Sequence, residues 1–127
     1  MTLDQIFSFA IKKNASDVHI IVGLAPILRI NGSLKELKEA DKMSFSEMRE
    51  IVFRILTEQQ KERLEREREL DFSYQIKDSS RLRVNCFFEK GNLGLVARII
   101  PAEIPSMDSL DMPKIIFDLT REPQGLI

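Results

Sequence analysis

The sequence predicts one α+β domain, in which helices flank an antiparallel sheet. Apolar residues recur at helical spacing in two segments of the amino-terminal half. From Leu70 onward apolar residues alternate with polar ones, as they do in strands that bury one face. A chain of 127 residues is long enough to surround one hydrophobic core and too short for two.

The composition is that of a globular protein and argues against several functions. Hydrophobic residues make up 43% of the chain and charged residues 31%, both near the globular average. A net charge of -1 gives no overall basic field, so we expect no nucleic-acid partner. One cysteine and one histidine supply neither an internal disulfide nor a zinc cluster, so we expect no metal site. No signal peptide or membrane-spanning run is visible, which favours a cytoplasmic location.

The first segment predicts a helix, a strand and a hairpin. The helix begins at Leu3, with Thr2 and Gln5 placed as a capping box, and ends near Asn14. Residues 18–22 form a β-branched run, which we expect to be a strand buried on both faces. The Asn31-Gly32 pair between residues 27–30 and 33–35 is typical of a type I′ hairpin turn.

Two further helices are predicted, each with its own capping box. The first follows Ser44 and carries an apolar stripe from Met48 to Leu56. The second follows Thr57 and is nearly all charged from Glu58 to Glu69, which is typical of a solvated helix. Opposite charges four residues apart predict the ion pairs Lys61/Glu65, Glu62/Arg66 and Arg63/Glu67.

Three antiparallel strands follow, after which the chain changes character. Their alternating apolar residues are Phe72, Tyr74 and Ile76, then Leu82, Val84, Cys86 and Phe88, and finally Leu95, Ala97 and Ile99. Pro101 and Pro105 end the sheet, because proline cannot donate a ladder hydrogen bond. We therefore expect a domain over residues 1–100 and a linker over 101–127, with one helix after Pro113. The chain ends on apolar residues after a turn at Gly125, a pattern that is typical of the start of a new strand.

No complete catalytic site is predicted in this chain. The glycines do not fall in the spacing of a phosphate-binding loop. His19 has no evident nucleophile, so we interpret it as a hydrogen-bonded structural residue, and Cys86 as inert core packing. Ser16 and Asp17 are interpreted as strand-entry residues that satisfy nearby backbone donors.

Arg83 and Arg98 are the candidate binding residues. Both lie on the polar phase of adjacent predicted strands, so they share one face, opposite or diagonal to each other. Like charges across a strand pair repel, so nearby carboxylates or a bound anion would explain why two arginines share one face. The alternative is that their stems cover an apolar face while the charged groups meet water or acidic side chains.

Five short segments occur in order along the chain: A-S-D-V-H-I from Ala15, G-L-A-P-I-L-R-I-N-G from Gly23, E-L-D-F-S-Y from Glu69, R-L-R-V-N from Arg81 and A-R-I-I-P from Ala97. Together they resemble the amino-terminal, PAS-like domain of the PilT family of type IV pilus retraction ATPases, in the secretion-ATPase superfamily. The ending E-P-Q-G-L-I also resembles the segment that leads into the family's phosphate-binding loop. The resemblance covers nearly the whole chain and implies a PAS-like antiparallel sheet with flanking helices, followed by a linker helix.

The resemblance also implies a function. Members are hexameric motors for pilus retraction and twitching motility that bind ATP and Mg²⁺ between this domain and a RecA-like domain. Arginines of the first domain reach the nucleotide phosphates, a role that falls on Arg83 and Arg98, with Arg81 as a weaker third candidate. The family's catalytic residues lie in the RecA-like domain, so we expect neither ATP hydrolysis nor tight nucleotide binding from this chain alone.

The resemblance further implies partners: the RecA-like domain, neighbouring subunits of a homohexamer, and a pilus platform protein at the inner membrane, where the cytoplasmic motor would sit peripherally. Two alternatives stay open. One is a self-standing PAS-like domain that senses a ligand or binds a protein partner. The other is a domain that only mediates subunit contacts, through the charged segment from Glu58 to Glu69.

Overall fold

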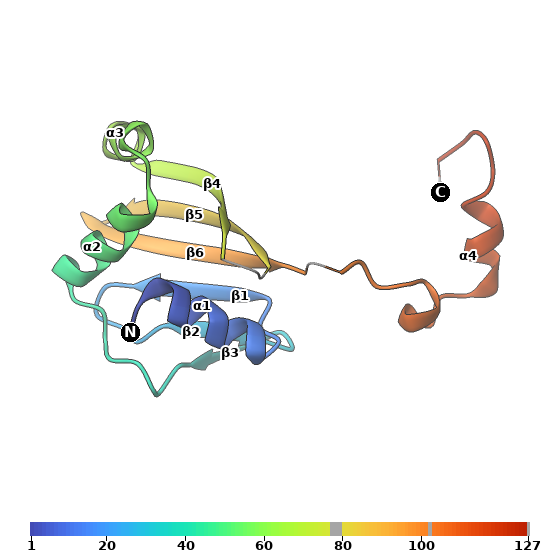
Figure 1. Cartoon of the computed structure of the whole chain (residues 1–127), viewed down its shortest axis with the longest axis horizontal. Coiled ribbons are helices and arrows are strands. Elements are labelled where there is room, and N and C mark those ends of the chain that lie inside the picture. The colour runs from blue at the N-terminus through green and yellow to red at the C-terminus, as the bar shows by residue number, and fades with distance from the viewer. Residues whose placement is uncertain (77–79, 102, 127) are drawn as a thin grey trace.

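The fold is an antiparallel sheet with helices packed on one face, in a computed structural model that describes residues 1–76, 80–101 and 103–126. Strand order across the sheet is β3-β2-β1-β6-β5-β4 (Figure 1). The strands are β1 (Asp17–Ile21), β2 (Ile27–Ile30), β3 (Ser33–Glu36), β4 (Glu69–Gln75), β5 (Arg81–Glu89) and β6 (Asn92–Ile100). The helices are α1 (Leu3–Lys12), α2 (Phe45–Ile55), α3 (Glu58–Glu67) and α4 (Lys114–Leu119), with a 3₁₀ turn at Asp108–Leu110. The predicted α+β class is confirmed.

Local sequence signals set the ends of these elements. The predicted capping boxes at Thr2, Ser44 and Thr57 are all present, and each satisfies two otherwise unpaired N–H groups at a helix start. Asn31 and Gly32 have positive φ angles of 49° and 78°, which confirms the predicted turn between β2 and β3. The sheet ends at Ile100, immediately before Pro101, as expected.

The core lies between the helices and one face of the sheet. Fully buried side chains from α1, α2 and α3, such as Phe7, Met48 and Leu64, pack with Val18 and Ile20 of β1. The alternate residues of β1, His19 and Ile21, are only half-buried. The prediction that this strand is buried on both faces is therefore wrong, because all three helices contribute to the core on one side.

The charged helix α3 is mostly solvated, as predicted, but its ion pairs differ from the prediction. Of the three predicted pairs, Arg63–Glu67 is present, at 2.7 Å. Glu65 instead pairs with Arg49 of α2, at 2.6 Å, which joins the two helices. The helix ends at Arg68 in a left-handed conformation, with its guanidinium 3.6 Å from the centre of the Phe88 ring.

Residues beyond the sheet extend away from the rest of the domain (Figure 1). They contain the predicted helix after Pro113, α4, whose Ile115 is exposed. The expectation about the apolar end of the chain falls partly on Ile127, which lies outside the described residues. Within the part of the chain that is described, no helix is long and apolar enough to cross a membrane.

Leu64 is the one fully buried residue of α3, so it should dominate the attachment of this helix. We expect Leu64→Ala to lower the free energy of unfolding by about 2–5 kcal/mol, through lost burial and the cavity left behind. Urea unfolding followed by circular dichroism measures this loss. The matched control is Glu62→Ala on the exposed face, which should change stability by less than about 0.5 kcal/mol. Equal effects of the two substitutions would contradict the assignment.

Candidate functional site

Strands β5 and β6 place two arginines face to face. Their connection is a tight turn in which Lys90 and Gly91 both have positive φ angles, of 50° and 82°. The resulting register pairs Arg83 directly with Arg98. The two residues therefore share a face, as predicted, and lie opposite each other rather than diagonally. This is the half-exposed face, on the side away from the core.

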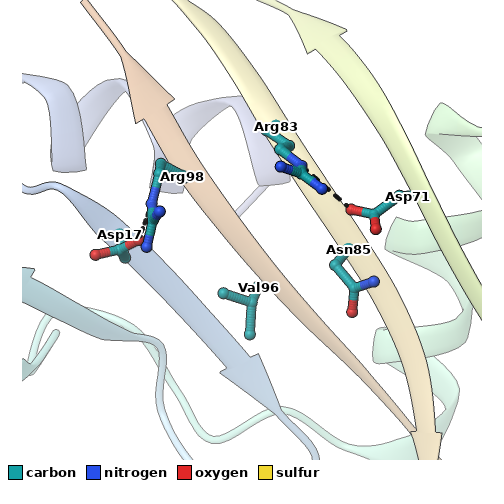
Figure 2. Close-up of a pocket in the computed structure, with 6 residues that line it drawn as sticks. All are labelled: Asp17, Asp71, Arg83, Asn85, Val96 and Arg98. Carbon is teal, nitrogen blue, oxygen red and sulfur yellow. Dashed lines mark hydrogen bonds and ion pairs between the residues drawn. The ribbon is translucent and has the colours of Figure 1, made fainter. Parts of the chain in front are cut away.

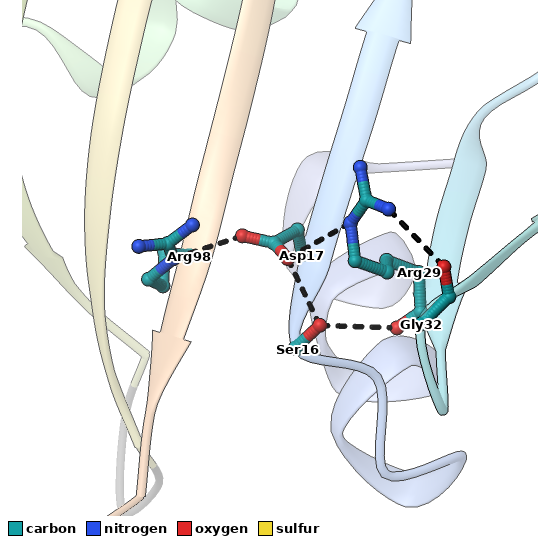
Figure 3. A network of polar contacts seen from close by, with 5 residues as sticks. All are labelled: Ser16, Asp17, Arg29, Gly32 and Arg98. Atoms are coloured by element: carbon teal, nitrogen blue, oxygen red, sulfur yellow. Dashed lines mark hydrogen bonds and ion pairs between the residues drawn. The ribbon is translucent and has the colours of Figure 1, made fainter.

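A buried carboxylate binds the second of these arginines. Asp17 of β1 lies opposite Arg98 of β6 on one side and opposite Arg29 of β2 on the other. Arg98 Nε donates a hydrogen bond to Asp17 Oδ1 over 3.0 Å, and Arg29 Nε lies 3.3 Å from Oδ2 (Figure 3). Ser16 Oγ donates to Oδ2 over 2.9 Å. The interpretation of Asp17 as a residue that satisfies backbone donors is therefore wrong: its carboxylate meets two guanidiniums and a hydroxyl.

The pKa of Asp17 reflects these contacts. Burial alone would raise the pKa of this carboxyl group. The hydrogen bonds from Arg98 and Ser16, together with the charges of Arg98 and Arg29, outweigh burial and lower the pKa below its ordinary value of 3.8. Asp17 is thus held in its ionised form.

The first arginine has a looser partner. Arg83 Nε lies 3.6 Å from Asp71 Oδ1 of β4, which is an ion pair but longer than a hydrogen bond. The side chains of Arg83 and Asp71 are 72% and 52% exposed. Exposed pairs of this kind contribute at most about 1 kcal/mol and leave both side chains free to move.

A pocket of about 230 Å³ lies between the two arginines (Figure 2). Its lining consists of Asp17, Asp71, Arg83, Asn85, Val96 and Arg98. Both guanidiniums approach their carboxylates through Nε, and no hydrogen bond between described residues uses the terminal Nη groups of either arginine. These planar N–H groups match the oxygens of a phosphate or carboxylate. Two arginines and two aspartates leave the pocket near neutral, and Arg29 adds one positive charge beside it.

The remaining candidates stand apart from this pocket. Arg81 pairs with Ile100 across the strands and is not among the residues that line it. His19 lies between Ile27 and Val96 on the half-exposed face, and its buried Nε2 has no hydrogen-bond partner among the described residues. The interpretation of His19 as hydrogen-bonded therefore fails at this atom, and burial followed by the charge of Arg29 lowers its pKa.

Cys86 is fully buried, and burial raises its pKa to about 12, which confirms its interpretation as unreactive core. Among residues 1–76, 80–101 and 103–126, no group of three or more histidine, cysteine or acidic side chains could hold a metal ion. Carboxylates near the two arginines were expected, but their identities, Asp17 and Asp71, and the contact of Arg29 with Asp17 were not predicted. The alternation of β4 could have indicated Asp71, which lies on its polar phase.

Comparison with known proteins finds relatives that match the whole chain. The chain is 28% identical over all of its 127 residues to the type IV pilus retraction ATPase PilT of Pseudomonas aeruginosa, and 27% identical to the type IV pilus ATPase PilU of the same organism. These matches cover 37% and 33% of the two relatives. A crystal structure of the pilus retraction motor PilT with bound ADP superposes with a TM-score of 0.81 and 29% identity. Over its whole length the chain is thus similar to the amino-terminal domain of these secretion ATPases.

The chain matches only part of each of these relatives. The superposition on PilT covers 96% of this chain and 36% of the other, so the domain spans about a third of the length of these relatives. The ATPase DotB of Legionella pneumophila shares the fold, with a TM-score of 0.80 over 98% of this chain, at 21% identity. No family model matches the domain.

The lowered pKa of Asp17 predicts how acid affects stability. Because the folded state binds this proton less readily than the unfolded state, the contribution of Asp17 is fully present above about pH 4 and is lost as the pH falls through its folded pKa. Unfolding free energies of the native chain and of Asp17→Asn, measured in urea from pH 6 to pH 2.5, should therefore converge on acidification. A constant difference over this range would show that the ionised carboxylate does not stabilise the fold.

Proposed function

We propose that this domain works in a nucleotide-driven motor of the pilus and secretion ATPase family, and that Arg83 and Arg98 bind the phosphates of ATP. The observation that carries the proposal is the pair of opposed guanidiniums beside a pocket on the half-exposed sheet face (Figure 2). Guanidinium groups bind phosphate oxygens through paired N–H donors. The similarity to a retraction motor crystallised with ADP supports a nucleotide as the ligand.

Arg83 and Arg98 suit the phosphate groups of a nucleotide, but these residues alone do not make a complete, tight nucleotide site. ATP, with Mg²⁺, would supply the phosphoryl group whose transfer to water releases free energy. Arg83 and Arg98 would orient phosphate oxygens and stabilise the negative charge that develops on them. Because the pocket is near neutral, we expect weak phosphate binding by this chain alone and no hydrolysis. The remaining contacts would come from a second domain.

The proposed architecture follows from the same similarity. Residues 1–100 would form the domain, and residues 101–127 the linker to a RecA-like ATPase domain. Closure of the two domains over the nucleotide would couple hydrolysis to movement. We propose a homohexamer that powers pilus retraction and twitching motility, in the cytoplasm and peripheral to the inner membrane, with the pilus platform protein as its membrane partner. In support, the relatives that share this fold include a retraction motor.

Titration of the ¹⁵N-labelled chain with inorganic tripolyphosphate tests the phosphate assignment. We expect shifts in the NMR signals of the Arg83 and Arg98 side chains, and about tenfold weaker binding in Arg83→Gln or Arg98→Gln, because each removes charged hydrogen bonds. Arg81→Gln is the matched control: it removes the same charge from the same strand as Arg83, outside the pocket, and should bind more tightly than either variant. Equal weakening by all three would indicate non-specific attraction.

A second test uses a protein in which this domain is joined to a RecA-like domain. There we expect Arg98→Gln to lower ATP turnover about 100-fold or more, because a positioned positive charge acts on the transition state. Unchanged turnover in both Arg83→Gln and Arg98→Gln would remove the proposed role of these arginines.

A further inference from the structure

The two arginines of the pocket each face a carboxylate, but in very different surroundings. Asp17 is 8% exposed and accepts a 3.0 Å hydrogen bond from Arg98 Nε. Asp71 is 52% exposed and stands 3.6 Å from Arg83 Nε. A hydrogen-bonded contact to a buried carboxylate restricts a side chain more than a long contact to an exposed one. Arg98 is therefore held more firmly than Arg83, although the two side chains are equally exposed, at 73% and 72%.

Asp17 is itself fixed from the side away from the pocket. Arg29 Nε lies 3.3 Å from Asp17 Oδ2, and Arg29 Nη1 donates to the carbonyl oxygen of Gly32 over 3.2 Å, in the turn between β2 and β3 (Figure 3). Ser16 Oγ donates to the same carboxylate oxygen. The carboxylate thus has contacts with β2 and with the start of β1 that do not involve Arg98.

The contact geometry leaves Arg98 available for a ligand. Asp17 engages Nε and not the terminal Nη groups, so the outer part of the guanidinium can bind an anion while the ion pair stays intact. Arg29 continues to compensate the charge of Asp17 when Arg98 also contacts an anion. Holding a binding group in place before the ligand arrives lowers the entropy cost of binding.

We propose that Asp17 is a positioning residue of the phosphate site, which orients Arg98 from behind, whereas Asp71 does not position Arg83. This inference rests on the proposed binding of phosphates by Arg98. It predicts a change in phosphate affinity opposite in sign to the change that simple electrostatics predicts. Removing a negative charge beside an anion site should tighten binding. Removing a positioning residue should weaken it.

Asp17→Asn and Asp71→Asn provide the matched pair, because both remove one negative charge from the lining of the same pocket. In NMR titrations of the 127-residue chain with inorganic tripolyphosphate at low ionic strength, we expect Asp71→Asn to tighten binding. We expect Asp17→Asn to weaken it about tenfold, which corresponds to the loss of one charged hydrogen bond. Tightening by both variants would overturn the proposal.

The Nε–Hε signal of Arg98 gives a readout of orientation that does not depend on ligand. In the native chain this proton is hydrogen-bonded to Asp17 and should exchange slowly with water, whereas Asp17→Asn should speed its exchange. The Arg83 signal should be unaffected by Asp17→Asn. An unchanged Arg98 signal in the folded variant would also overturn the proposal.

Asp17→Glu keeps the proposal testable if Asp17→Asn fails to fold. It retains the charge and moves the carboxylate by one methylene. A positioning role predicts that this variant binds tripolyphosphate more weakly, whereas an effect of charge alone predicts unchanged binding. Arg98→Gln separates the two hypotheses. If Arg98→Gln binds like the native chain, the proposed phosphate role fails. If Arg98→Gln weakens binding while Asp17→Asn and Asp17→Glu do not, only the positioning role fails.

Discussion

The antiparallel register of β6 with both of its neighbours is the constraint on which the candidate site depends. β6 pairs Arg98 with Asp17 of β1 on one side and with Arg83 of β5 on the other. On β1, Asp17 also pairs with Arg29 of β2. Four strands thus bring the three arginines and one aspartate into a single row across the sheet. A slip of one residue in any of these pairings would send part of the row to the core face.

The row contains a repulsive pair that its neighbours compensate. Two arginines directly opposite each other on adjacent strands are unfavourable by themselves. Carboxylates on the outer sides, Asp17 and Asp71, each contact one of them. The space between the guanidiniums stays open above Val96, which has no charge to fill it (Figure 2). This arrangement gives each cation its own carboxylate and leaves a pocket between the two arginines.

The distribution of helices explains why this row can be polar. α1, α2 and α3 place their buried residues against the face that carries Val18, Val84 and Ala97, all of them fully buried. The hydrophobic core is complete on that side, so the other face is free to carry charges without losing core burial. Asp17 is buried on this polar face because flanking arginine side chains and Ser16 surround it. Its burial is therefore compatible with ionisation.

Much of the fold could be predicted because it rests on local signals. Three capping boxes, one Asn-Gly turn and the alternation in β4, β5 and β6 each depend on residues close in sequence, and each is confirmed. The helical ion pairs were predicted less well, because Glu65 has a competing partner, Arg49, on a neighbouring helix. Local spacing describes which pairs can form and not which partner is nearer in the folded chain.

The sequence by itself determined the α+β class, the strand periodicity and the shared face of Arg83 and Arg98. Only the tertiary structure decided that these two residues are directly opposite, that β1 has one half-buried face, and that Asp17 joins Arg98 to Arg29. The physical reason is that side-chain alternation follows from the backbone of one strand. Asp17 and Arg98 are far apart in sequence. Strands β1 and β6 pair them only when the helices and the sheet pack together around the hydrophobic core.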